Sequence, residues 1–410
     1  MTTDVLDEIL DEAGAQLPGA VELRRRLHER PELGNDLPTT QAAVLEAIDD
    51  LDLGVTLGTT TSGIVAVLDG AEPGPTVLLR GDMDALPMPE DTGLEFASRN
   101  DGAMHACGHD AHVAMLAGAA RLLAARRGAL RGRVAFMFQP GEEGHHGAKH
   151  MLDDGLLATA GAGAEPVSMA FAIHQSPTIP SGLVATKGQA LLASADEFEI
   201  TIRGRGGHAS MPHHTSDPIP IACELVTSIQ AMVTRRVDVF DPAVVTVAKI
   251  RGGTTTNVIP ETATLWGTIR TVSEKTRLAV MEDIERLAQG LAIAHGATAE
   301  VELTHGYPVT VNHDDAAAFA LATAQQVLGE HSAVEMPTPV MGAEDWSYVL
   351  QQVNGAMAFL GTRPKGVAPH QVAPNHSNRM VLDEGAMAAG IATYSAVALR
   401  WLEPPHPDPT

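Results

Sequence analysis

Three histidines, an aspartate and a cysteine lie within nine residues, in the stretch MHACGHDAH at 104–112. Cys107 and His109 are separated by one glycine, which lets two side chains converge where the backbone bends into a helix. Thiolate and imidazole are good ligands for zinc-like ions, and a helix N-terminus lowers the pKa of a thiol. The stretch therefore suggests a metal site, a thiol nucleophile with a histidine base, or a polar helix start without a function.

Other polar side chains follow apolar segments elsewhere in the chain. They are Asp82 and Asp84 in RGDMDALP, Glu142 and Glu143 in QPGEEGHHGAKH, His174 after MAFAI, and His376 in APNHSNRM. Neighbouring carboxylates can divide into a metal ligand and a general base, and a buried pair of like charges needs a cation. Taken singly, a glutamate pair in a loop or a lone histidine is more often a surface feature.

Nucleophilic and nucleotide-binding sites find less support. The sequence contains no GxSxG elbow, P-loop, complete GxGxxG, HExxH or CxxC. Cys107 with His109 as its base is a weaker hypothesis, because residues two apart on a bend seldom point at one another and the glutamate pair would have no role. A metal site with ligands from dispersed loops accounts for more of these residues.

The elements that must position these residues alternate between strand and helix. Apolar strands are predicted at 62–68, 75–86 and 131–144, and helices at 18–30, beginning at Pro18, and at 112–125. Buried strands separated by helices predict an α/β fold with a doubly wound, mostly parallel sheet. In such folds ligands bind at the carboxyl ends of the strands, where the polar clusters lie.

The middle of the chain has a different pattern. Strands are predicted at 195–204, 243–253, 262–271 and 298–306, and helices at 217–236 and 276–296. This β-α-β-β-α-β order predicts a ferredoxin-like α+β domain, inserted at 189–306 as a lid. The catalytic domain is then discontinuous, 1–188 and 307–410, and resumes with a helix at 313–329, a strand at 354–361 and a helix at 384–402.

Composition restricts the partners and the compartment. Of 410 residues, 51 are acidic and 27 basic, so the formal charge of −24 disfavours nucleic acid and anionic membranes as partners. Two cysteines cannot form a disulfide framework for a chain of this length, which favours a reducing compartment. The acidic start MTTDVLDEILDEAG lacks the apolar core of a signal peptide, and no apolar run reaches the roughly 18 residues of a membrane span. We therefore expect a cytoplasmic protein.

Eight motifs occur in an order that resembles one enzyme family. They are RRRLHERPELG, RGDMDALPM, MHACGHDAHVAMLAGAA, FQPGEEG, GRGGHASMPHHTSDPI, GGTTTNVIPE, GTIRT and MGAEDWSYVL. The family is that of the dinuclear-metal amidohydrolases, which includes hippurate hydrolase, bacterial N-acyl-amino-acid deacylases and plant auxin-conjugate hydrolases. The resemblance extends over about residues 20–390.

The resemblance implies a set of metal ligands and a general base. The ligands of two divalent ions would be Cys107, His109, Glu143, His174 and His376, with Cys107 bridging the two ions. Glu142 would be the general base toward the attacking water, and Asp84 would orient a ligand histidine. Sulfur ligation favours Zn²⁺, and the mixed ligands also admit Mn²⁺, Co²⁺ or Ni²⁺.

The resemblance also implies functions for the inserted domain. His208 in GRGGHA would reach the metal site of a neighbouring subunit and stabilise the oxyanion, which implies a homodimer formed through this domain. Asn257 would lie beside His208, and Arg270 would bind the carboxylate of a small-molecule substrate. Without the resemblance, we would interpret both His208 and Arg270 as structural.

The resemblance implies hydrolysis of N-acyl-L-amino acids, such as hippurate or N-acetyl-amino acids, and alternatives stay open. One is a metallo-dipeptidase or aminopeptidase, which needs a group for a free α-amine; another is a non-catalytic metal-binding protein. This chain departs from the usual motifs at His145, His146 and His150, which we expect at the rim or surface, and at PNHSNRM. His112 and Cys223 lie on apolar helix faces and are expected in the core.

Overall fold

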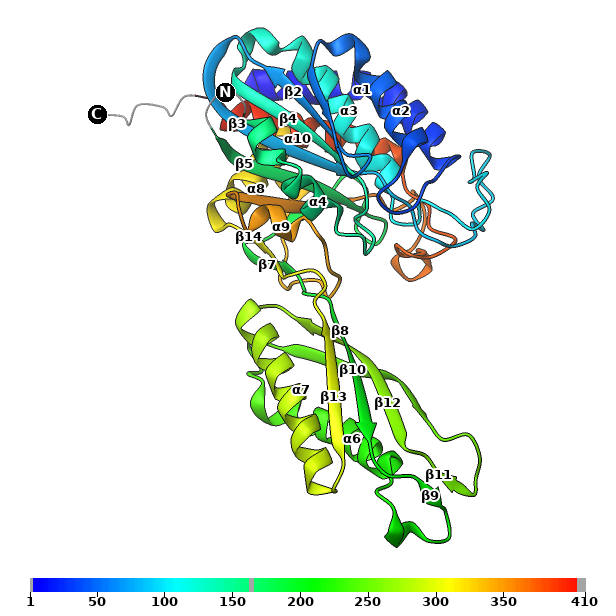
Figure 1. Cartoon of the computed structure of the whole chain (residues 1–410). Coiled ribbons are helices and arrows are strands. Elements are labelled where there is room, and N and C mark those ends of the chain that lie inside the picture. Colours follow the sequence, from blue (N-terminus) through cyan, green and yellow to red (C-terminus); the bar gives the residue numbers. More distant parts are fainter. Residues whose placement is uncertain (1–2, 162–165, 404–410) are drawn as a thin grey trace, which may run out of the picture. The chain divides into compact units, whose positions relative to one another are not determined.

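The computed structural model describes residues 3–161 and 166–403. The chain forms two compact units (Figure 1). Unit 1 comprises Met1–Leu191, Val311–Thr338 and Tyr348–Thr410, and unit 2 comprises Leu192–Thr310 and Pro339–Ser347. The chain therefore passes between the units near Leu192 and Thr310, whereas the sequence pattern suggested 189 and 306.

Unit 1 is built on an eight-stranded mixed sheet. Its strands, in spatial order, are β1 (Gly54–Leu57), β2 (Ile64–Asp69), β4 (Arg131–Gln139), β3 (Glu72–Asp82), β5 (Val167–Ser176), β16 (Gly355–Gly361), β6 (Val184–Thr186) and β15 (Ala333–Glu335). The central strands β4, β3, β5 and β16 are mutually parallel. Strands β1 and β2 pair antiparallel with their neighbours, and β6 pairs antiparallel with β16 but parallel with β15. The expected α/β class is confirmed, and the sheet is mixed rather than mostly parallel throughout.

Helices of unit 1 cover this sheet. They are α1 (Thr3–His28), α2 (Pro38–Ile48), α3 (His109–Ala125), α4 (Gly147–Asp153), α5 (Leu156–Ala160), α8 (Asp314–Leu328) and α10 (Met387–Trp401). Helices α3, α8 and α10 contact the strands directly, and α1 packs against α3, α8 and α10 (Figure 1). Strands such as β16 are buried along their whole length, which explains their uninterrupted apolar sequence.

The first helix corrects one prediction. Pro18 does not begin a helix but lies inside α1, which starts at Thr3. Ile9 and Ala13 before the proline, like Leu23 and Leu27 after it, are buried in the core of unit 1. Burial on both sides of Pro18 offsets the backbone hydrogen bond that a proline removes, about 3 kcal/mol in a helix interior.

Unit 2 contains a four-stranded antiparallel sheet. In spatial order its strands are β10 (Ala243–Gly252), β12 (Thr262–Thr271), β8 (Asp196–Arg203) and β13 (Thr298–Thr304). Helices α6 (Pro218–Arg236) and α7 (Glu274–Ala294) pack on one face, because alternate residues of β8 and β12 are buried there. A short pair, β9 (Gly207–His208) with β11 (Val258–Ile259), belongs to the same unit.

A few elements complete the described chain. The segments β7 (Gln189–Leu192), β14 (Thr310–Asn312) and α9 (Ser347–Leu350) lie where the chain passes between the units. The sequence analysis predicted none of these, nor α2, β1, β6 and β15. In the part of the chain that the structure describes, no helix is both long enough and apolar enough to cross a bilayer.

Candidate metal centre

The loop before α3 brings a thiol and two imidazoles together. Cys107 precedes Gly108, whose φ of +79° turns the chain into the helix that begins at His109. His174 lies near the end of β5, with its Nε2 3.4 Å from Cys107 Sγ. Its Nδ1 lies 2.6 Å from the carbonyl oxygen of Gln175, which can only accept, so Nδ1 carries the hydrogen and the Nε2 lone pair faces the thiol. The ligand atoms of Cys107, His109 and His174 all lie within 4.8 Å of one another.

Carboxylates surround the His109 ring. Its Nε2 is 3.4 Å from Asp82 and 3.8 Å from Glu143, and its Nδ1 is 3.4 Å from Asp84. Neither ring nitrogen makes a hydrogen bond of good geometry to any described residue. Burial lowers the pKa of His109, but Asp82, Asp84 and Glu143 together raise it to about 10. The surroundings therefore favour positive charge at this position.

A second group of ligand atoms lies beside the first. His376 Nε2 is 3.2 Å from Glu143 Oε1, and both belong with Cys107 to a set whose ligand atoms lie within 4.8 Å of one another. Glu143 is largely buried, whereas 56% of the His376 side chain is exposed. Cys107 is thus common to two triads, one with His109 and His174 and one with Glu143 and His376.

Asp84 holds the glutamate pair. Its two carboxylate oxygens accept the backbone N–H groups of Glu142 and Glu143, both at 2.9 Å. Because Asp84 also lies beside His109 Nδ1, one buried carboxylate positions a ligand histidine and the loop after β4. Glu142 itself is buried, and its carboxylate lies with the His109 imidazole and the Glu143 carboxylate in a further candidate ligand group.

The electrostatics of the site fit divalent cations. Burial, together with the negative charges of Glu143, Glu142 and Asp82, raises the pKa of the Cys107 thiol well above its ordinary value. Burial and neighbouring histidines keep the pKa of His174 well below its ordinary value, so this ring is neutral. A thiol that ionises most readily beside a cation, a neutral imidazole and an excess of carboxylates suit divalent metal ions.

His112 belongs to the support of this site and not simply to the apolar core. It is buried, as expected, but its Nε2 accepts the backbone N–H of Gln175 at 2.7 Å. Its Nδ1 therefore carries the hydrogen and donates to Asp82 at 2.5 Å, and Asp82 also pairs with Arg80 at 2.9 Å. The spacing of His109 and His112, three apart on one helix face, was a signal that the sequence analysis did not use.

The three residues predicted in unit 2 are less constrained. His208 of β9 is exposed, and its Nδ1 accepts the backbone N–H of Ser210 at 3.1 Å. Asn257 is also exposed and precedes Val258, the β11 residue that pairs with His208. The structure thus brings His208 and Asn257 together. Arg270, on β12, is half-buried in the sheet and lies in a different part of the unit.

The remaining predictions concern histidines and a cysteine outside the proposed ligand set. His145 is exposed, while His146 and His150 are half-buried; His146 has a φ of +55° and its Nδ1 is 2.9 Å from the Tyr348 hydroxyl. The prediction that Cys223 lies in the core is wrong. Cys223 is exposed because the buried face of α6 runs through Ile221, Leu225 and Ile229 instead.

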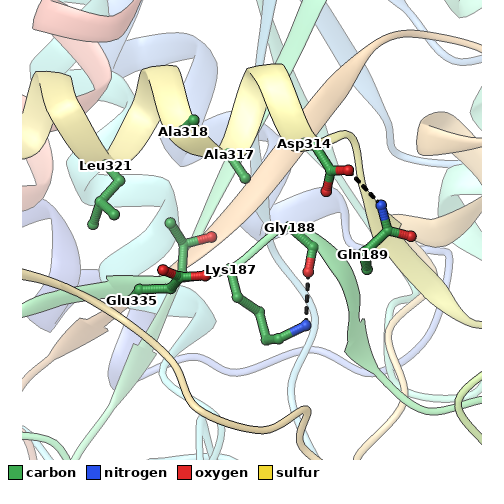
Figure 2. Close-up of a pocket in the computed structure, with 9 residues that line it drawn as sticks. Lys187, Gly188, Gln189, Asp314, Ala317, Ala318, Leu321 and Glu335 are labelled. Atoms are coloured by element: carbon green, nitrogen blue, oxygen red, sulfur yellow. Dashed lines mark hydrogen bonds between the residues drawn. The ribbon is translucent and has the colours of Figure 1, made fainter.

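A separate hollow of about 420 Å³ in unit 1 contains none of the predicted site residues. Its walls come from Thr186–Gln189, the first turns of α8 and Glu335, as Figure 2 shows. Gln189 donates to Asp314, and Lys187 donates to the carbonyl oxygen of Gly188. None of the lining residues belongs to a candidate ligand group of the described chain, so the hollow is separate from the candidate metal centre.

Comparison with known proteins places this geometry in context. The model of the family described as peptidase family M20/M25/M40 matches residues 78–400. Thermostable carboxypeptidase 1 of Saccharolobus solfataricus is 37% identical over 387 residues, covering 93% of this chain and 95% of that protein. IAA-amino acid hydrolase ILR1-like 2 of Arabidopsis thaliana is 37% identical, with coverage of 93% and 85%.

Two comparisons with Bacillus subtilis proteins agree. Its N-acetylcysteine deacetylase is 35% identical over 384 residues, which cover 93% of this chain and 97% of that protein. A solved structure described as a dinuclear metal binding peptidase from the M20 family has a TM-score of 0.80 and 32% identity, and covers 95% of this chain and 99% of that chain. The similarity thus extends over nearly the whole length of both proteins.

Proposed function

This chain belongs to peptidase family M20/M25/M40, and on that premise we propose that it hydrolyses the amide bond of N-acyl-L-amino acids. The products are a carboxylate and a free amino acid. One observation carries the proposal: Cys107 is shared by two triads of ligand atoms, directly beside the buried Glu142. Two cation positions next to a buried carboxylate suit the hydrolysis of an unactivated amide.

The ligands in this proposal are Cys107, His109 and His174 for one cation and Cys107, Glu143 and His376 for the other. When bound, two divalent ions, Zn²⁺ or Mn²⁺ with Co²⁺ or Ni²⁺ as alternatives, would polarise the substrate carbonyl and acidify a water molecule. Glu142 takes the proton of the attacking water and then gives it to the nitrogen of the leaving amine. Asp84 keeps Glu142 in place through the backbone bond described above.

We propose that unit 2 acts as a lid and forms a homodimer. His208, with Asn257 beside it, would stabilise the oxyanion at the metal centre of a second subunit, and Arg270 would pair with the substrate carboxylate. The exposed position of His208 supports a role outside its own unit. Strand β10 is an edge strand with Val244 and Ile250 about half exposed, which supports an association between copies along this edge.

What the relatives share supports the proposed class of substrate. An N-acetylcysteine deacetylase and an IAA-amino acid hydrolase both act, by their names, on an amino acid with an acylated nitrogen. A carboxypeptidase, the second candidate, is favoured by the 37% identity to one of that name. Both reactions release an amino acid with a free carboxylate, so Arg270 would serve either. An aminopeptidase would also need a carboxylate for the free α-amine.

The test is a hydrolysis screen after removal of metals and reconstitution with each ion. Hippurate, N-acetyl-amino acids, N-protected dipeptides and free Gly-Xaa dipeptides are compared by kcat/KM. We expect acyl amino acids to be the best substrates. Preference for N-protected dipeptides would favour a carboxypeptidase, preference for free dipeptides would contradict the proposal, and turnover that does not depend on any added ion would contradict the metal mechanism.

A further inference from the structure

Gln175, the residue after His174, bonds through its side chain to two other segments that carry proposed metal ligands. It is fully buried at the end of β5. Its side-chain Nε2 donates to the carbonyl oxygen of Cys107 and to Asn375 Oδ1, each at 2.7 Å. Its Oε1 accepts the hydroxyl of Thr362 at 2.7 Å. Both hydrogens of the amide nitrogen are thus used, and one carries a bond to the loop of Cys107 while the other carries a bond to the loop of His376.

The two sides of the metal centre are held very differently. His109 opens a long helix and His174 lies on a strand that pairs with both β3 and β16, and both side chains are buried. His376 instead lies in a loop with a φ of +66°, and its side chain is more than half exposed. Its backbone N–H donates to the carbonyl oxygen of Ala106 at 2.9 Å. The neighbouring Asn375 links this loop to Gln175 through a part-buried bond to the side-chain Nε2 at 2.7 Å and a longer bond, at 3.4 Å, to the backbone carbonyl oxygen.

The backbone at Gly108 accommodates the amide of Gln175. A Cβ atom placed on Gly108 would lie 2.6 Å from both Cγ and Nε2 of Gln175, closer than such atoms can approach. The positive φ of Gly108 and this close approach both require glycine. The Gln175 side chain therefore packs directly on the turn between Cys107 and His109, where a shift of either partner would be transmitted to the ligands.

We propose that Gln175 is a positioning residue that fastens the His376 loop to the Cys107 loop, and so sets the affinity of one cation position more than the other. The sensitive position is that of Cys107, Glu143 and His376, because the first triad keeps its helix and strand supports without Gln175. The backbone bond from Gln175 to His112, which supports the His174 side, does not depend on the side chain. This inference rests on the proposed dinuclear site.

The experiment compares wild type with Gln175→Met, which fills similar space without hydrogen bonds. Metal-free protein is titrated with Mn²⁺, and binding is followed by calorimetry and by electron paramagnetic resonance, which distinguishes a single ion from a coupled pair. We expect wild type to bind two ions. In Gln175→Met the first ion should bind within about threefold of wild type and the second about 10- to 100-fold more weakly, the usual cost of losing a support of a metal ligand.

A double-mutant cycle with Asn375→Ala tests whether the link itself is responsible. If Gln175 acts through Asn375, the double variant should weaken the second ion little more than the stronger single variant does. Thr393→Val is the control, because Thr393 is a buried threonine whose hydroxyl donates to the carbonyl oxygen of Ala389 in its own helix. This control should leave both affinities unchanged.

Hydrogen exchange supplies a readout without metal. In metal-free Gln175→Met, the amide of His376 should exchange faster than in wild type, while amides of β5 stay protected. Equal affinities for both ions in wild type and variant, or equal weakening of both ions, would overturn the inference while leaving the proposed function intact. Wild-type protein that binds fewer than two ions would overturn the proposed function, and the inference with it.

Discussion

The metal centre of unit 1 and the three predicted substrate residues of unit 2 differ in how firmly they are held. In unit 1, Cys107, His109 and His174 are buried, and Asp82, Asp84 and His112 fix their surroundings through hydrogen bonds. In unit 2, His208 and Asn257 are exposed and Arg270 is half-buried. Under the proposed function, the three buried ligands of unit 1 are pre-organised by folding, whereas His376, more than half exposed in a loop, is held less firmly.

This difference predicts that substitutions in the two units affect different steps of the proposed reaction. Changes in unit 1 should alter ion binding or the chemical step, and changes in unit 2 should alter turnover or substrate affinity while leaving the ions bound. Under the proposed function, His208, Asn257 and Arg270 would act only when substrate and a second subunit complete their surroundings. The predictions below test this separation, beginning with the largest effect.

The adjacent glutamates provide the sharpest contrast within unit 1. Glu142→Gln should reduce kcat by about 10²–10⁴-fold, the usual contribution of a general base, while two ions stay bound. Glu143→Gln should instead reduce the metal content, because Glu143 lies with Cys107 and His376 in one triad. Metal analysis and kcat measured on both variants check this. Near-normal turnover in Glu142→Gln would refute its role as the base.

In unit 2, His208→Ala should lower kcat by about 10²–10³-fold without loss of metal, as expected when an oxyanion donor is removed. The metal content is the measurement that separates this variant from Glu143→Gln. Mixing His208→Ala chains with Glu142→Gln chains should restore part of the activity, since some sites would receive both intact residues. Absence of recovery, despite demonstrated exchange of subunits, would indicate that each site is completed within one chain.

Arg270 should affect substrate affinity rather than the chemical step. Arg270→Ala is expected to raise KM for an N-acyl amino acid by about 10- to 100-fold with a smaller change in kcat, because a charge-assisted bond to the carboxylate is lost. As a control, the KM of wild type and of Arg270→Ala is also measured on the carboxamide form of the same substrate, which lacks the negative charge. If wild type and variant differ as much on the amide, Arg270 does not bind the carboxylate.

The smallest effect concerns a buried ionic network at the start of α3. His28 Nδ1 lies 2.7 Å from Asp110 and its Nε2 lies 3.2 Å from Glu90. Burial lowers the pKa of His28, but Asp110 and Glu90 raise it by more, so it lies above its ordinary value. The stabilisation is therefore complete below the unfolded pKa of about 6.5 and is lost as pH rises through the higher folded value.

His28→Gln tests this sign. At pH 6 the variant should be less stable than wild type by on the order of 1 kcal/mol, the usual net contribution of an intramolecular hydrogen bond. The difference should shrink toward pH 9. Urea unfolding of metal-free protein at both pH values measures it, and a difference that grows with pH would contradict the raised pKa.

The sequence predicted the fold better at its centre than at its edges. Runs of apolar residues predict long buried strands such as β4 and β16, whereas β1 is exposed along its whole length and has no such pattern. Helix α1 was predicted too short, because local rules treat Pro18 as a start and cannot see the core that holds both halves of the helix. Cys223 was misplaced because it follows the buried Ala222, and one step along a helix turns the side chain by about 100° away from the core.

The sequence predicted the residues of the candidate site whose side-chain types are distinctive by themselves. Cys107, His109 and the glutamate pair attract attention by type and spacing, and resemblance to a family added His174 and His376. Gln175 and the hydrogen-bonding role of His112 were missed, because an amide after a strand and a histidine on an apolar helix have ordinary explanations. Their roles depend on contacts between residues more than 60 positions apart, which no local pattern contains.

Anomalous diffraction from crystals loaded with Mn²⁺ or Zn²⁺ tests the central claim most directly. We predict two anomalous peaks in each unit 1, with Cys107 Sγ coordinating both ions, His109 and His174 on one, and Glu143 and His376 on the other. A single peak, or two peaks of which neither is bound by Cys107, would contradict the account.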